Sequence, residues 1–316
     1  MHIPDGFLDP KTSLATAAIA LAGVSYSLVR LRKTLSARQV PMIGLAAAFI
    51  FAAQMLNFPV MGGTSGHLIG AALAAVLFGV HGAVLVMTAV LLLQCFLFAD
   101  GGVTALGANI LNMGIVAVYV GYFMYSLVQK ITGESLRNRL LATGLAAWCS
   151  TVAGAFFCSG QLAFSGSAPA GLVFPAMTTI HILIGVGECV ITTLVVYSLS
   201  KTRPELFAAS KETTHSAAEW SFVGYGIAVS LGLAVFLAPL ASASPDGLER
   251  VAGLLGFEQL AHETPLVASP LPDYAIPGLT SPIAATILAG VIGLLATFAV
   301  AFLLARSLAA RAPDRL

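Results

Sequence analysis

The chain has 316 residues, of which 58% are hydrophobic and only 9% are charged, and its formal net charge is +1. Soluble domains carry roughly a quarter charged residues, so this composition excludes an ordinary soluble protein and indicates one embedded in a lipid bilayer. The small net charge and the lack of a basic patch also exclude a nucleic-acid partner.

Apolar runs long enough to cross a hydrocarbon core of ~30 Å recur along the chain. Backbone polar groups in lipid must be satisfied within each segment, and the alternation of a membrane barrel is missing, so the sequence predicts helices. We predict an all-α polytopic membrane bundle of about seven helices plus two accessory helices. These cover residues 10–31, 40–57, 67–80, 82–99, 104–129, 139–164, 174–200, 219–241 and 282–308, the short third one being part of a crossing.

The chain opens with MHIPDGFLDP, which contains two Asp but no Lys or Arg. A secretory signal begins with a basic stretch, so we expect no cleaved leader and a mature protein that keeps Met1. The bulky His2 also disfavours removal of Met1, because methionine trimming favours small second residues. Asp9 before Pro10 predicts an N-cap and a first-turn proline at the start of the first helix.

The basic residues predict the orientation of the bundle. Thirteen of the 15 Lys and Arg follow the first, fifth, seventh or ninth predicted helix. The positive-inside rule puts these segments in the cytoplasm. The N-terminus, the loops 58–66 and 100–103, and the segment 242–281 then face outward. We therefore predict a multi-pass protein of a bacterial cytoplasmic membrane with its N-terminus outside.

Two units are separated by a polar stretch. Residues 1–205 form the seven-helix unit, and residues 206–218, LFAASKETTHSAA, are small and polar, as is typical of a cytoplasmic linker. Residues 219–316 add two helices around an outward segment that contains PDGLE. Pro270, Pro272 and Pro277 argue against a regular helix in the later part of that segment.

A histidine directly behind a free amino terminus can chelate a metal ion. The Met1 amine, the His2 amide nitrogen and Nδ1 of His2 close a five-membered and a six-membered ring, and leave one corner of a plane open. Square-planar nitrogen coordination suits Ni(II) or Cu(II). His67 follows a glycine-rich loop and starts on the same outer side, so its imidazole is our candidate for the fourth corner.

Either histidine alone would be a structural residue, near a frayed terminus or at a helix end. Their presence on one side of the membrane favours a metal site. The residues Ile3-Pro4-Asp5-Gly6 predict a tight turn that folds the tail back, and the glycines of the loop NFPVMGGTSG allow a close approach of another backbone.

Other polar residues near these segments have two readings each. Ser65 is a candidate to orient His67 or His2, or simply a helix cap. Asn109 and Asn112, three apart on the fifth predicted helix, are candidates to hydrogen-bond the metal loop or to join helices. His181 and Glu188 lie seven apart on one helix face. An intramembrane carboxylate is costly and marks a functional candidate, either in supporting the metal loop and releasing the ion or in a buried structural pair.

Four segments resemble the substrate-binding component of nickel/cobalt energy-coupling-factor transporters: MHIPDGFL, GGTSGHLIGAALAAVLFG, FADGGVTALGANILNMGIV and HILIGVGE. The resemblance covers about residues 1–205. The segments PDGLE and PDYAIPG resemble the small accessory membrane component of the same systems, here fused. The resemblance implies that Met1, His2 and His67 bind the metal in a square plane. It also implies partners, namely a transmembrane coupling component and ATP-binding-cassette ATPase subunits.

The sequence has no G-x-x-x-x-G-K-[ST] loop, so we expect ATP hydrolysis on partner subunits and a transporter subunit rather than an enzyme. Nickel(II) uptake is the predicted function, and cobalt(II) is the first alternative substrate. A proton-coupled metal carrier that uses His181 and Glu188 is a second alternative. A metalloenzyme is disfavoured, because H-E-x-x-H is absent and four planar ligands leave no convenient place for an activated water.

Overall fold

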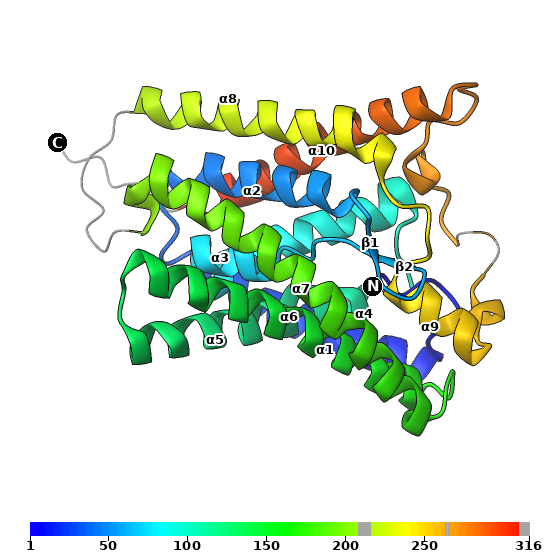
Figure 1. Cartoon of the computed structure of the whole chain (residues 1–316). Coiled ribbons are helices and arrows are strands. Elements are labelled where there is room, and N and C mark those ends of the chain that lie inside the picture. Colours follow the sequence, from blue (N-terminus) through cyan, green and yellow to red (C-terminus); the bar gives the residue numbers. More distant parts are fainter. Residues whose placement is uncertain (208–215, 263, 265, 310–316) are drawn as a thin grey trace.

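The computed structural model describes residues 1–207, 216–262, 264 and 266–309. It shows long apolar helices packed side by side, with the N-terminus inside the bundle close to β2 and α9 (Figure 1). Within the described residues, seven helices are long and apolar enough to cross a membrane, and α2, Gln39–Gln54, is a shorter apolar helix. The all-α membrane architecture predicted from composition is therefore confirmed.

The first helix, α1 (Pro10–Leu31), begins and ends where the sequence predicts. The side chain of Asp9 accepts a hydrogen bond from the backbone amide of Thr12 at 3.1 Å, which satisfies one of the free donors at the helix start. Pro10 occupies the first helical position, where its missing N–H costs nothing.

The helix α3 (Ala71–Phe98) bends sharply at Gly79, whose φ of 68° and ψ of 179° are not helical. A straight helix would place residues 69 and 94 about 37 Å apart. Instead, Gln54 donates to the carbonyl of Ile69 at 2.7 Å and accepts from Gln94 at 2.6 Å. The chain thus turns back at Gly79, and its two arms correspond to the predicted helices 67–80 and 82–99. The first arm begins at Ala71 rather than at His67.

The next crossing is composite. It consists of α4 (Leu106–Asn109), the π-helical segment η1 (Ile110–Val116) and α5 (Ala117–Thr132). It is followed by α6 (Leu136–Phe164) and α7 (Ala170–Thr202), which pack along each other. A short 3₁₀ turn, η2 (Pro204–Phe207), ends this part. Of the predicted linker 206–218, residues 208–215 lie outside the described residues.

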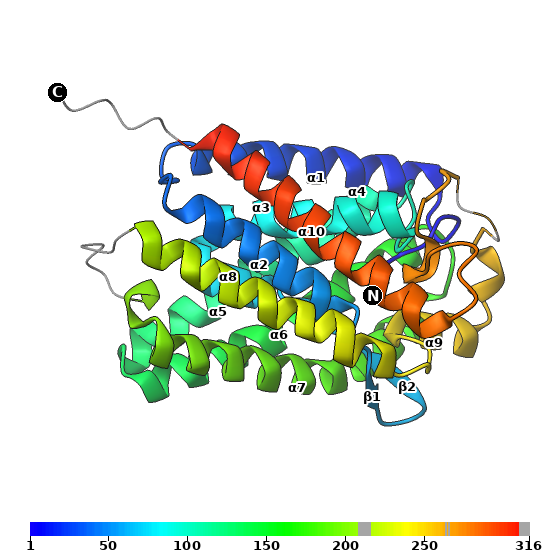
Figure 2. The same ribbon diagram turned by 90° about the horizontal axis from the view of Figure 1, so that it is seen from above.

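The accessory unit packs directly on the first unit. Its helices are α8 (Ser216–Gly232), extended by η3 (Leu233–Leu237) and η4 (Ala238–Leu240), and α10 (Pro282–Leu308). Both helices contact α2, and α10 also contacts α3. Seen from above, α8, α2 and α10 lie side by side (Figure 2).

Five small elements belong to the predicted outward loops. Strands β1 (Phe58–Val60) and β2 (Thr64–Gly66) form an antiparallel hairpin. The helix α9 (Gly247–Leu255) starts at PDGLE, and the 3₁₀ turns η5 (Glu258–Leu260) and η6 (Pro272–Tyr274) follow it. Neither the hairpin nor α9 was expected from the sequence. A capping box between Asp246 and Glu249 starts α9, which packs against α7 and β2.

Candidate metal centre

The amino-terminal tail lies inside the protein, since Met1 is 4% exposed and Ile3 is fully buried. Asn109 holds the tail with both ends of its amide. Its Oδ1 accepts from the backbone amide of Ile3 at 2.8 Å, and its Nδ2 donates to the carbonyl of the same residue at 3.1 Å. Asn109 was expected either to hydrogen-bond a segment that carries candidate metal ligands or to join helices. The structure shows the first of these contacts.

Gly102 completes this anchor from the loop after α3. Its amide donates to the carbonyl of Ile3 at 2.8 Å. A Cβ atom at this position would lie 2.2 Å from the backbone nitrogen of Asp5, so only glycine fits without a shift of the tail. Asp5 is itself bonded to Thr104, whose amide donates to Oδ1 at 2.8 Å. The predicted turn at residues 3–6 is thereby fixed against the loop that follows α3.

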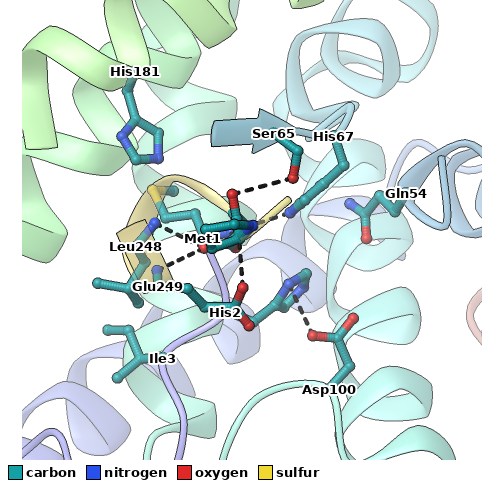
Figure 3. Close-up of polar contacts among 12 residues, drawn as sticks. Met1, His2, Ile3, Gln54, Ser65, His67, Asp100, His181, Leu248 and Glu249 are labelled. Carbon is teal, nitrogen blue, oxygen red and sulfur yellow. Dashed lines mark hydrogen bonds and ion pairs between the residues drawn. The ribbon is translucent and has the colours of Figure 1, made fainter. Parts of the chain in front are cut away.

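The amine of Met1 and the imidazole of His67 meet at the centre of the site. The amine nitrogen is 3.1 Å from Nε2 of His67. Nδ1 of His67 lies 3.0 Å from the carbonyl of Leu68, which fixes the ring and directs Nε2 to the amine. The rings of His2 and His67 stack with centroids 5.3 Å apart. The three predicted metal-binding residues thus come together (Figure 3).

Glu188 of α7 holds the loop that carries His67. Its two carboxylate oxygens accept from the amides of Ile69 at 2.6 Å and of Gly70 at 2.9 Å. The side chain is 1% exposed, so these two charge-assisted hydrogen bonds are made away from bulk water. Glu188 therefore supports the candidate metal loop, one of the two roles expected for it.

The side chain of His2 is held by two acceptors. Its Nδ1 lies 3.2 Å from Oδ1 of Asp100, and its Nε2 lies 3.1 Å from Oε1 of Gln94. Asp100 follows the second arm of α3, and Gln94 lies on that arm. The bend at Gly79 therefore brings both the loop of His67 and the residues that hold His2 to one place.

The accessory unit also reaches the amine. Oδ2 of Asp246, in the PDGLE segment, accepts from the Met1 amine at 2.6 Å. The other oxygen, Oδ1, caps α9 by accepting from the amides of Leu248 and Glu249. One carboxylate thus links the terminal amine to the start of α9.

The charges at the site set the protonation of its groups. Burial lowers the pKa of the Met1 amine, but the Asp246 carboxylate outweighs it and raises the pKa above its usual 8.0. Burial opposes ionisation of Asp246, but the amine holds its pKa well below the usual 3.8. Burial and the positive amine lower the pKa of His67 to about 3, and burial lowers the pKa of His2. Neutral imidazoles are the form that binds metal ions.

His181 and Ser65, two further predicted residues, make different contacts near the site. His181 lines a small cavity together with Met1, His67 and Asp246, while its Nδ1 lies 2.8 Å from the carbonyl of Met177. Ser65 donates to the carbonyl of Ser244 at 2.7 Å and not to either histidine. Ser65 is therefore a contact to the accessory unit.

Asn112 does not reach the metal-candidate loops. Its amide exchanges two hydrogen bonds with Gln161 of α6, at 2.8 Å and 2.7 Å. This is the helix-joining role that the sequence analysis held open for it. Short π-helical segments are common at functional sites. In the one that carries Asn112, this side chain joins two helices instead.

Three contacts of the site were not expected from the sequence, namely those of Asp246, of Gln94 and of Tyr274, whose hydroxyl donates to Asp100. Asp246 and Tyr274 lie in the PDGLE and PDYAIPG segments, which the sequence analysis singled out without assigning a role. Gln94 also joins α3 to α2, because its amide nitrogen donates to Oε1 of Gln54 at 2.6 Å. The signal for all three was a polar residue in an otherwise apolar or proline-rich segment.

The ion pair between Met1 and Asp246 gives a test by pH. We expect Asp246→Asn to destabilise the metal-free protein by about 2 kcal/mol near pH 6, the usual range for a hydrogen bond to a charged group. Because the pKa of the amine is raised in the folded protein, the stability that the protonated amine contributes is full below pH 8.0. This stability is lost as pH rises through the folded-state pKa of the amine. Because the pKa of Asp246 is lowered in the folded protein, the stability that its carboxylate contributes is present above pH 3.8. This stability is lost as pH falls through the folded-state pKa of Asp246.

The measurement is unfolding of the detergent-solubilised protein at pH 6 and at pH 10. Asparagine is also a good N-cap, so α9 is retained in the variant. An equal loss of stability at both pH values would mean that the helix cap, and not the ion pair, causes the change.

Comparison with known families gives two matches. Residues 2–206 match the model of the cobalt uptake substrate-specific transmembrane region, and residues 220–310 match the PDGLE domain. The matched ranges leave residues 207–219 between them.

Individual relatives span nearly the same length. A protein of Archaeoglobus fulgidus, named as a fused nickel transport protein NikMN, is 39% identical over 97% of this chain and 98% of its own. The fused nickel transport protein NikMN of Rhodobacter capsulatus is 33% identical over 87% of this chain and 88% of its own. The cobalt transport protein CbiM of Acetoanaerobium sticklandii is 31% identical over 68% of this chain and 90% of its own.

A solved structure supports the same assignment. The crystal structure of a truncated transition metal transporter covers 64% of this chain and 99% of its own, with a TM-score of 0.58 and 32% identity. These matches agree with the multi-pass membrane bundle. The chain is a multi-pass membrane transport protein that belongs to the cobalt-uptake substrate-specific transmembrane family and carries a fused PDGLE domain.

Proposed function

We propose that this chain captures nickel(II) as the substrate-binding membrane component of an energy-coupling-factor importer. The observation that carries the proposal is the 3.1 Å distance between the Met1 amine and Nε2 of His67, with His2 next in the chain. Metal–nitrogen bonds of about 2 Å place neighbouring corners of a square about 2.8 Å apart. The amine and His67 are therefore already near the separation of two adjacent ligands.

The donor set in this proposal is the Met1 amine, the His2 amide, the His2 imidazole and the His67 imidazole. Within the stretches that the structure describes, no group of three or more His, Cys, Asp or Glu side chains is arranged to hold a metal ion. Side chains alone do not supply the site there, which supports a role for backbone nitrogen.

Binding exchanges protons for the ion. The amine is a cation in the metal-free protein and loses one proton, and the His2 amide loses a second. One divalent ion and one amide anion replace one ammonium, so the net charge of the site stays at +1. Asp246 and Asp100 then face the same net charge before and after loading, which avoids placing an uncompensated charge in the protein interior.

Nickel is preferred over cobalt in this proposal for two reasons. Four nitrogen donors in a plane suit Ni(II). The relatives that share the fused organisation over most of this chain are named as nickel transport proteins. The cobalt transport protein of Acetoanaerobium sticklandii, in contrast, matches only 68% of the chain.

The test of the substrate is metal analysis with magnetic measurement. We expect one Ni(II) per chain and a diamagnetic complex, as square-planar Ni(II) is. Tighter binding of Co(II) than of Ni(II) would contradict nickel as the substrate, and a paramagnetic nickel complex would contradict the planar donor set. Titration of both ions under identical detergent and pH conditions makes the comparison.

The remaining parts of the proposal concern assembly. Uptake draws on a transmembrane coupling component and ABC ATPase subunits, because this chain has no P-loop. The N-terminus and the accessory segment face outward, residues 1–205 capture the ion, and residues 219–316 form the accessory unit. Uptake by this chain alone in proteoliposomes, abolished by collapse of a proton gradient, would contradict the need for partner subunits.

A further inference from the structure

Tyr274 connects the accessory unit to His2. It belongs to η6 in the outer segment of the accessory unit, and its hydroxyl lies 2.5 Å from Oδ2 of Asp100. The opposite oxygen of that carboxylate, Oδ1, faces Nδ1 of His2. Gln94 also donates to the Tyr274 hydroxyl at 3.2 Å. The hydroxyl therefore contacts both groups that hold the His2 ring.

The position of Tyr274 is fixed from two sides. Its ring stacks on Phe98, with centroids 4.6 Å apart and an interplanar angle of 17°. Its backbone and that of Asp273 are left-handed, with φ of 55° and 52°. Bulky residues rarely adopt this conformation, and such strain persists only where surrounding contacts enforce it. The amide of Leu271, which donates to the carbonyl of Leu97, ties the same turn to α3.

The hydrogen bonds around His2 have a defined direction. The carbonyl of Ile69 only accepts, so the Gln54 atom that contacts it is the amide nitrogen. The oxygen of Gln54 then faces the nitrogen of Gln94. The oxygen of Gln94 consequently faces Nε2 of His2, while Asp100 faces Nδ1. Both nitrogens of the ring thus face acceptors, and the single N–H of a neutral ring on Nδ1 donates to Asp100.

This arrangement competes with the chelate. The chelate needs the lone pair of Nδ1 of His2, and in the structure that atom faces the carboxylate of Asp100. We propose that Tyr274 is a positioning residue that keeps Asp100 on Nδ1 of His2 in the metal-free protein. The accessory unit thereby sets how readily His2 is released to the metal. This inference rests on the proposed function, because it assumes that His2 is a metal ligand.

The test removes one hydroxyl. Tyr274→Phe keeps the ring that stacks on Phe98 but leaves Asp100 without its hydrogen bond from Tyr274. We expect nickel to bind three- to tenfold more tightly. This factor corresponds to part of the free energy of one hydrogen bond to a charged group, the bond that holds Asp100 in place. The gain is expected in the association rate, measured by stopped-flow absorbance. The absorption spectrum of the loaded complex is expected to stay unchanged, because Tyr274 is not a ligand.

Two further variants make the result specific. Tyr26→Phe on α1 removes a hydroxyl that accepts from Arg30, and it is expected to leave nickel binding unchanged. Asp100→Asn offers His2 a weaker, neutral acceptor and is expected to shift binding in the same direction as Tyr274→Phe. Damage to the fold would weaken binding, so the expected gain cannot come from damage.

The outcomes separate the two proposals. Affinity and association rate equal to or below wild type in Tyr274→Phe would overturn the positioning role, provided that His2→Ala abolishes binding. Nickel binding that is the same in wild type and His2→Ala would instead overturn the proposed function. Measuring all variants with Ni(II) alone, in one detergent and at one pH, keeps these outcomes distinct.

Discussion

One residue added in front of Met1 is expected to weaken nickel binding at least about 100-fold, a loss of roughly 3 kcal/mol. The extension converts the Met1 amine into an amide nitrogen, which can bind the ion only after losing a further proton. It also needs space that the structure does not offer, because Met1 is 4% exposed. His2→Ala and His67→Ala are expected to lose affinity to a similar degree.

The measurement is nickel titration of the extended and unextended proteins by isothermal calorimetry. His81→Ala serves as the matched control, since this histidine lies on α3 outside the candidate donor set. Circular dichroism and thermal unfolding verify that each variant is folded. Tight nickel binding by the extended protein that still depends on His67 would show that the Met1 amine is not a ligand. An extended tail that chelates the ion alone supplies four nitrogens, and its binding is insensitive to His67→Ala.

Glu188→Ala is expected to cost about 3 kcal/mol of stability and most of the nickel affinity. The substitution leaves the buried amides of Ile69 and Gly70 without their acceptors, and each orphaned donor costs roughly 1–3 kcal/mol. The loop that carries His67 then loses its anchor to α7. Thermal unfolding in detergent measures the first effect, and nickel titration measures the second.

Glu188→Gln is the matched control for this prediction. Its single side-chain oxygen accepts from one of the two amides, so its stability and affinity are expected to lie between wild type and Glu188→Ala. Wild-type affinity in Glu188→Ala would mean that the position of His67 does not depend on α7.

The membrane helices were predictable because their signal is long and local. The first and last predicted helices, 10–31 and 282–308, agree with α1 and α10. Each combines an apolar run with a polar N-cap and a first-position proline, which fix the start of the helix from adjacent residues. The sequence also predicted two helices, 67–80 and 82–99, and the structure breaks α3 close to their boundary, at Gly79.

The contacts of the accessory unit were not predictable to the same degree. Asp246 bonds to Met1, 245 positions earlier, and Tyr274 bonds to Asp100, 174 positions earlier. Neither pairing leaves a periodic trace in the sequence. The helix α9 has a capping box that a local search could have found, but prolines later in the same segment argued for an irregular chain. The grouping of Met1, His2 and His67 rested on coordination chemistry and on the shared side of the membrane.

The bend at Gly79 also means that one helix serves both sides of the candidate site. The arm before the bend follows the loop of His67, and the arm after it carries Gln94 and leads to Asp100. A larger residue at Gly79, whose φ is 68°, would strain the bend and displace both sides together. A residue remote from the candidate donors thus controls whether the two halves of the donor set meet.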